Sequence, residues 1–130
     1  LYNGVNIMYV QKPWGHELVW ARTKDYVGKI IHVNANQKLS RQYHSIKDES
    51  IYVLKGTLTL EIGLENLTQT LTLTEGQNFR IAPYTVHRFI ADDGDVDIME
   101  VSTPQLNDVI RLKDEYGRID PEDEIISLLD

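Results

Sequence analysis

Four residues whose side chains commonly bind divalent metal ions lie in two segments of this chain. Gln42 and His44 flank a single residue, Glu49 follows shortly after, and His87 lies further along. Alternate side chains of a β-strand point to the same face, so Gln42 and His44 would lie on one side about 7 Å apart. Glu49 and His87 each open another β-prone run. An amide oxygen, two imidazoles and a carboxylate can therefore converge from three strands, which predicts a site for zinc, iron(II), manganese or nickel.

Each of these residues alone is weak evidence for a metal site. Isolated histidines on strand faces are more often structural than ligands, and an acidic residue before a strand usually marks a solvated strand end. Gly56 closes the first segment and Gly76 precedes the second by one short strand. The combined pattern favours a metal site over separate structural roles.

Short runs of β-branched and aromatic residues alternate with turn-forming residues along most of the chain. The predicted strands span residues 17–20, 27–33, 39–44, 50–54, 58–62, 67–73, 78–81, 87–90 and 96–102. In the run 57–62, Leu58, Leu60 and Ile62 share one face, as in a half-buried antiparallel sheet. This regular spacing predicts an all-β sandwich or barrel of the jelly-roll kind.

Length and composition predict one domain over residues 1–130, with a barrel over about 12–118 and an acidic helical tail over about 120–130. Asp120 can cap that short C-terminal helix, with Pro121 at its first position. The chain has no cysteine. Any metal must then bind nitrogen and oxygen ligands, and a reducing, cytoplasmic location is expected.

The charge distribution argues against nucleic acid as a partner, and the lack of a long apolar run argues against a membrane span. The net charge is −7, and residues 108–130 hold eight acidic residues against three basic ones. No basic stripe is present, so nucleic-acid binding is not expected. No apolar run is long enough to cross a membrane. A small anionic ligand needs only one or two local cations, which net charge does not report.

The segments around the metal-binding pattern resemble the cupin superfamily. Residues 12–15 (Lys-Pro-Trp-Gly), 38–44, 52–56 and 108–118 look like the C-terminal cupin domain of type II phosphomannose isomerases. The resemblance runs in order over nearly the whole chain. It implies an all-β, cupin-type double-stranded β-helix.

The resemblance also implies a function and partners. In the phosphomannose isomerase cupins, a Gln-x-His pair with Glu and a distant His binds zinc, which identifies Gln42, His44, Glu49 and His87 as the metal ligands. The implied activity is a metal-dependent interconversion of mannose 6-phosphate and fructose 6-phosphate. We expect a homodimer, as in other cupins, and association with a sugar nucleotidyltransferase, the domain that the cupin follows in those proteins.

Two departures from the family pattern are notable. Tyr84 stands where the family usually has glycine, at a position that suggests a positive φ, which tyrosine adopts only with strain. We therefore expect the turn before His87 to differ. Ser45 and Ile46 follow His44 where relatives often carry further histidines, so no additional metal contact is expected from that segment.

Two residues are candidates by type for the general base. Glu100 lies in the predicted strand 96–102 and His32 in the strand 27–33. Either could move a proton between adjacent carbon atoms of a sugar. Each could equally be a surface residue or a hydrogen-bonded wall residue.

Five basic residues are candidates for binding a phosphate group: Lys29, Arg41, Arg88, Arg111 and Arg118. If Gln42 and His87 face the metal, their neighbours Arg41 and Arg88 face away from it. Arg111 and Arg118 lie in a segment that matches the family and are favoured, with Lys29 as a third candidate. Ion pairs with nearby acidic residues are the alternative role for both arginines.

Two other functions fit the sequence. One is a different metal-dependent cupin enzyme, such as an iron(II) dioxygenase, which uses similar nitrogen and oxygen ligands. The other is a non-catalytic sugar-binding module that accompanies a nucleotidyltransferase. Fold alone does not separate them, because one scaffold hosts many activities.

Overall fold

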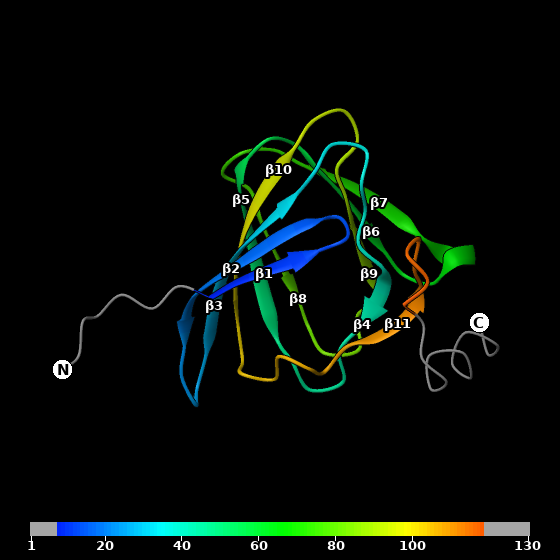
Figure 1. Ribbon diagram of the computed structural model, residues 1–130. Helices are drawn as coiled ribbons and strands as arrows, with labels where there is room; N and C mark the ends of the chain where they lie inside the picture. Colours follow the sequence, from blue (N-terminus) through cyan, green and yellow to red (C-terminus); the bar gives the residue numbers. More distant parts are fainter. Residues whose placement is uncertain (1–7, 119–130) are drawn as a thin grey trace.

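A computed structural model describes residues 8–118, which fold into two antiparallel β-sheets around a shared interior (Figure 1). The strands are β1 (Met8–Lys12), β2 (Gly15–Arg22), β3 (Val27–Val33), β4 (Arg41–Tyr43), β5 (Glu49–Lys55), β6 (Leu58–Ile62), β7 (Gln69–Leu73), β8 (Asn78–Ile81), β9 (His87–Ile90), β10 (Val96–Ser102) and β11 (Ile110–Lys113). A single 3₁₀ turn, η1 (Glu65–Leu67), is the only helical element of the described residues.

The structure confirms the all-β prediction, and five strands (β3, β6, β8, β9 and β10) have the predicted bounds. Strands β2 and β5 are longer than predicted, whereas β4 is shorter. Strand β7 begins later than predicted because the 3₁₀ turn η1 occupies the residues before it. Strands β1 and β11 were not predicted. The predicted C-terminal helix, residues 120–130, lies outside the described residues.

The two sheets share strands from distant parts of the sequence. One sheet has the order β1-β2-β3-β10-β5-β8 and the other β11-β4-β9-β6-β7. Strand β10 lies between β3 and β5, so late and early segments are hydrogen-bonded neighbours. Consecutive strands β4 and β5 belong to different sheets, as do β10 and β11. The connections between these pairs therefore cross from one sheet to the other.

The interior changes from apolar to charged along the strands. On β5, Val53 and Ile51 are buried in the apolar core, and the next inward residue is Glu49. On β10, Ile98 is in the core, and the next inward residue is Glu100. Since alternate residues share a face, these carboxylates lie at the same inner surface as the core. One end of the barrel interior is thus built for polar chemistry.

No helix within residues 8–118 has the length and apolar character needed to span a membrane.

Gly56, in the turn between β5 and β6, allows a close backbone approach. Its φ is +85°, and a Cβ there would lie 2.4 Å from the Asp95 carbonyl oxygen. Gly76 has a similar φ of +87°, but the nearest atom to a Cβ would be the Tyr52 hydroxyl oxygen at 3.8 Å. The two glycines share a backbone conformation and differ in available space.

We predict that Gly76→Ala lowers the free energy of unfolding by about 1–2 kcal/mol, because alanine is strained in the left-handed conformation. Gly56→Ala should lose a further ~1–3 kcal/mol from the steric conflict. Urea unfolding of both variants measures the difference. Equal losses would show that the approach of Asp95 does not constrain Gly56.

Candidate metal centre

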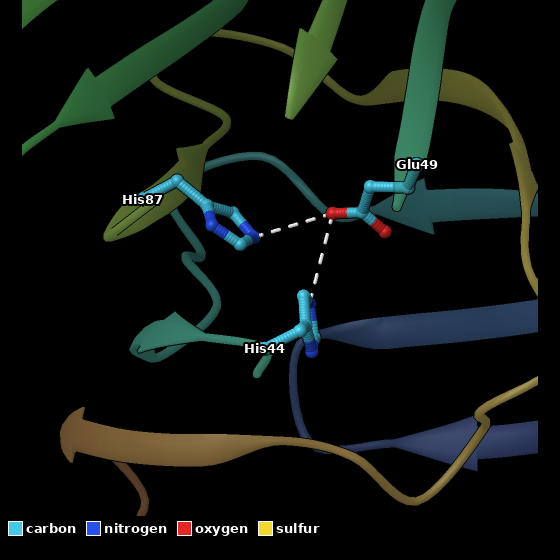
Figure 2. Close-up of side chains that lie close together, drawn as sticks. All are labelled: His44, Glu49 and His87. Carbon is cyan, nitrogen blue, oxygen red and sulfur yellow. Dashed lines mark ion pairs between the residues drawn. The ribbon is translucent and has the colours of Figure 1, made fainter. Parts of the chain in front are cut away.

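Three predicted ligands converge at the polar end of the interior. Glu49 Oε1 lies 3.7 Å from His44 Nε2 and 3.4 Å from His87 Nε2 (Figure 2). One ligand atom from each residue lies within 4.8 Å of the others, and all three side chains are buried. Glu49 begins β5 in one sheet, whereas His87 begins β9 and His44 follows β4 in the other. Both sheets therefore contribute to this group.

Hydrogen bonds at Nδ1 orient both imidazole rings so that each Nε2 faces Glu49. His87 Nδ1 donates to the Thr85 carbonyl oxygen at 2.8 Å, and His44 Nδ1 donates to the Asp108 carbonyl oxygen. A carbonyl oxygen only accepts, so each Nδ1 carries a proton, and the neutral form of either ring has its lone pair on Nε2. Neither Nε2 atom has a hydrogen-bond partner among the described residues. Buried nitrogen acceptors left in this way fit a metal ion.

The charge states of the group also suit a metal. Burial lowers the pKa of His44 to about 4, against the opposing charge of Glu49, so the ring is neutral at pH 7. Burial would raise the pKa of Glu49, but neighbouring positive charge, including the Lys47 ammonium, holds it well below its usual range. Neutral imidazoles and a carboxylate are the forms that bind divalent ions.

Gln42 lies next to this group, because it is the cross-strand partner of His87. Its Oε1 accepts a hydrogen bond of 2.6 Å from the Ser40 hydroxyl. Gln42 lines the same cavity as His44 and Glu49. The structure therefore places Gln42 beside the other three predicted ligands, and its role as a fourth ligand stays a prediction.

A buried lysine that the sequence analysis did not single out connects the metal ligands to Glu100. Lys47 Nζ lies 3.0 Å from Glu49 Oε2 and 3.0 Å from Glu100 Oε2. Lys29 continues the chain of charges, with Nζ 3.9 Å from Glu100 Oε2 and 3.3 Å from Glu17 Oε2. Burial and the charge of Glu49 raise the pKa of Glu100. Burial would lower the pKa of Lys47, but the two carboxylates raise it above its usual value.

Asp108 fixes the loop that holds His44 and Lys47. Its carboxylate accepts hydrogen bonds from the backbone N–H groups of Ser45, Ile46 and Lys47, and from the Ser45 hydroxyl. Burial would raise the pKa of Asp108, but these donors hold it at about 2. The sequence analysis considered Asp108 only as an ion-pair partner of an arginine.

A cavity of about 380 Å³ opens beside the metal ligands. Its basic lining residues are Lys12, Arg22, Lys29, Lys47, Arg111 and Arg118, and its acidic ones are Glu17, Glu49 and Glu100. Cations thus outnumber acids in the cavity although the chain as a whole is acidic. This lining suits an anionic ligand.

The phosphate-binding candidates differ in their surroundings. Arg118 forms a two-pronged ion pair with Asp114, the alternative role considered for it. Arg111 lines the cavity as the cross-strand partner of Gln42. Arg41 and Arg88 are absent from the lining of this cavity, in line with their predicted orientation. Their guanidinium groups bind Gly63 and Leu39 carbonyl oxygens, respectively.

His32 lies away from the metal ligands, on the outer face of its sheet. Lys29 and Ile31 of the same strand line the cavity, so alternation directs His32 to the opposite face. There it contacts Asp97 and Asp95 and stacks on His16 with ring centroids 4.9 Å apart. Of the two candidate bases, only Glu100 lines the cavity.

The turn before His87 keeps the backbone expected for glycine. Tyr84 has a φ of +67°, so the change of turn that we expected from the substitution is not found at this residue. Its N–H donates to the His44 carbonyl oxygen at 2.7 Å, and its ring stacks on Tyr43 at 6.1 Å. A non-glycine residue carries a strain of about 1–2 kcal/mol in this conformation.

Comparisons with known proteins found a family whose profile matches this chain. The profile of the family described as mannose-6-phosphate isomerase C-terminal matches residues 5–114. A search of curated protein sequences found no match.

Solved structures with a similar fold share little sequence with the chain. The capsular polysaccharide assembling protein CapF from Staphylococcus aureus has a TM-score of 0.73 and 13% identity, over 83% of this chain and 34% of that one. KdgF from Halomonas sp. has a TM-score of 0.65 and 19% identity, over 83% of this chain and 94% of that one. A protein with a double-stranded β-helix domain from Klebsiella pneumoniae has a TM-score of 0.64 and 19% identity, over 78% of this chain and 88% of that one. The chain thus spans about a third of the CapF chain, and these likenesses show the double-stranded β-helix fold.

We predict that His44→Ala and His87→Ala each lose bound metal, because each removes a buried ligand. Mass spectrometry of protein purified without chelator measures the metal content. With metal at about 100 times Kd, the wild type should gain ~2.7 kcal/mol of stability that the variants lack. His16→Ala, on the outer face, is the control and should keep its metal. Unchanged metal in both ligand variants would refute the site.

A second prediction concerns Asp108→Asn, which removes the charged acceptor of the ligand loop. At pH 7 the variant should unfold with about 1–3 kcal/mol less free energy than the wild type. The folded pKa of about 2 lies below the ordinary 3.8, so the carboxylate stabilises above pH 3.8 and loses this effect as the pH falls toward 2.

The stability gap between the wild type and Asp108→Asn should therefore shrink between pH 4 and pH 2. Urea unfolding at several pH values tests this, with the exposed Asp93→Asn as control. A gap that stays constant over this range would show that the Asp108 charge does not stabilise the loop.

Proposed function

The chain belongs to the family described as mannose-6-phosphate isomerase C-terminal, and from this premise we propose that it is a metal-dependent sugar-phosphate isomerase. The proposed reaction interconverts mannose 6-phosphate and fructose 6-phosphate. One observation carries the proposal: a buried carboxylate, Glu100, lines the cavity beside the candidate metal ligands and is not itself one of them. Such a residue is what an isomerase needs as a base.

Aldose–ketose isomerisation requires two catalytic contributions from a protein. A base must move one proton between C2 and C1, and the negative charge that develops on the oxygens must be stabilised. A divalent ion held by Gln42, His44, Glu49 and His87, for which we propose zinc, would stabilise that charge as a Lewis acid. A side chain of the cavity would carry out the proton transfer.

Glu100 is the proposed base. In the aldose-to-ketose direction its carboxylate takes the proton from C2, leaving an enediolate, and returns that proton to C1. The hydroxyl proton of O2 passes to O1, so the atoms balance. Burial, which raises the pKa of Glu100, makes its carboxylate a stronger base than an exposed one. Its position in the cavity supports the role for which His32, on the outer face, is badly placed.

Lys47 is proposed to position this base. It contacts both Glu49 and Glu100 and therefore holds a ligand carboxylate and a reactive carboxylate side by side without direct repulsion. Lys47 contacts Glu49 through Oε2, which leaves Glu49 Oε1 facing the two histidines. Metal binding by Glu49 and proton transfer by Glu100 would thus both depend on the ammonium group of Lys47.

We predict that Glu100→Gln lowers kcat for mannose 6-phosphate about 10²–10⁴-fold, the usual contribution of a general base, while metal content is unchanged. A coupled assay for fructose 6-phosphate, run on metal-loaded protein with and without chelator, measures the effect. Glu65→Gln, which removes an exposed ion pair with Lys113, is the matched control and should keep wild-type activity.

Three outcomes would contradict parts of the proposal. Activity of Glu100→Gln within a few-fold of the wild type would mean that another group is the base. Wild-type protein with stoichiometric metal but no turnover would exclude the isomerase and favour the sugar-binding module. Oxygen uptake by the iron-loaded protein would favour the dioxygenase alternative.

A further inference from the structure

Two half-buried cations in the cavity, Lys12 and Arg111, form no ion pair with any of the described residues. Lys29 and Lys47 contact buried carboxylates, Arg118 is paired with Asp114, and Arg22 is exposed to solvent. The side-chain nitrogens of Lys12 and Arg111, in contrast, make no hydrogen bond and no ion pair with any residue in the range 8–118. Arg111 Nε is fully buried without a partner.

The strand register places Arg111 at a defined distance from the metal ligands. Arg111 of β11 is opposite Gln42 of β4, and Gln42 is opposite His87 of β9. Neighbouring strands are about 4.8 Å apart, so the Arg111 backbone is about 10 Å from that of His87. The Arg111 side chain is therefore attached two strands away from His87, and the strand that carries Gln42 lies between them.

Lys12 belongs to the same electrostatic group. It ends β1, at the edge of the other sheet, and lines the same cavity. Burial lowers the pKa of Lys12, and the charges of Lys29, Arg111 and Arg118 lower it further, although Glu17 opposes them. These cations therefore repel one another across the cavity. A bound anion would remove this repulsion and supply the missing hydrogen-bond acceptors.

We propose that Lys12 and Arg111 together form the subsite for the phosphate dianion of the substrate. The planar guanidinium of Arg111 can bind two phosphate oxygens at once, and the ammonium of Lys12 adds a point charge from the opposite sheet. The phosphate is then held away from the metal ligands, so the other end of the sugar reaches Glu49 and Glu100. Naming a sugar phosphate rests on the proposed function, whereas the anion site rests on the cavity itself.

Binding of glucitol 6-phosphate, a sugar phosphate without a carbonyl group, tests the subsite by isothermal titration calorimetry. Lys12→Met and Arg111→Met should each weaken binding about tenfold or more, since each removes a charged hydrogen-bond donor. Arg111→Lys should recover part of the loss, because it restores charge without the planar fork. Neutral glucitol should bind the wild type and both methionine variants equally.

Exposed cations provide matched controls. Lys24→Met and Arg80→Met remove the same charges from the surface and should change binding less than about threefold at 0.15 M salt. Thermal melting of every variant checks that it is folded. A double variant, Lys12→Met with Arg111→Met, that binds glucitol 6-phosphate as tightly as the wild type would overturn the subsite. Glucuronate binding as tight as that of glucitol 6-phosphate would overturn its assignment to a phosphate dianion.

The subsite and the proposed reaction fail differently. Binding that depends on Lys12 and Arg111, without any isomerase turnover, would exclude the reaction and support the anion site. Turnover of mannose 6-phosphate with an unchanged KM in the double variant would support the reaction and exclude the site.

Discussion

The pairing of buried charges at one end of the barrel is the constraint on which the rest of the site depends. Glu49 and Glu100 are each only 2% exposed, and an unpaired ion in such an interior costs several kcal/mol. Lys47, between them, contacts both carboxylates. This contact allows two acids to share one interior and leaves one oxygen of Glu49 facing the histidines. The candidate metal ligands and the proposed base are therefore parts of a single electrostatic unit.

The two chain segments that cross between the sheets fix the position of residues in this electrostatic unit. The loop from β4 to β5 crosses from one sheet to the other, and so does the segment from β10 to β11. Asp108 in the second crossing binds the backbone of the first, and its carbonyl oxygen orients His44. Each crossing is thus fixed by the other. A rigid loop holds His44 and Lys47 in place before any ligand binds, which is the arrangement expected of a preorganised site.

Local charge in the cavity opposes the charge of the whole molecule. The chain carries a net charge of −7, whereas basic residues outnumber acidic ones around the cavity. Lys29 and Lys47 contact the buried carboxylates, whereas Lys12 and Arg111 form no ion pair within residues 8–118 and make up the proposed anion subsite. An acidic exterior does not prevent the binding of an anion, because burial strengthens nearby interactions and solvent screens distant ones.

The all-β class, most strand positions and the convergence of Gln42, His44, Glu49 and His87 were predictable from the sequence, because strand alternation and ligand chemistry are local properties. The alternation within β11, Ile-Arg-Leu-Lys, was a local signal for the unpredicted strand. Which charged side chains contact one another depends on the folded arrangement of the two sheets. Lys47 and Asp108 look like ordinary surface residues in the sequence, and their roles arise from contacts between segments in different sheets. Glu100 and His32 were equivalent candidates by residue type, and the inner and outer faces of the folded sheet separated them.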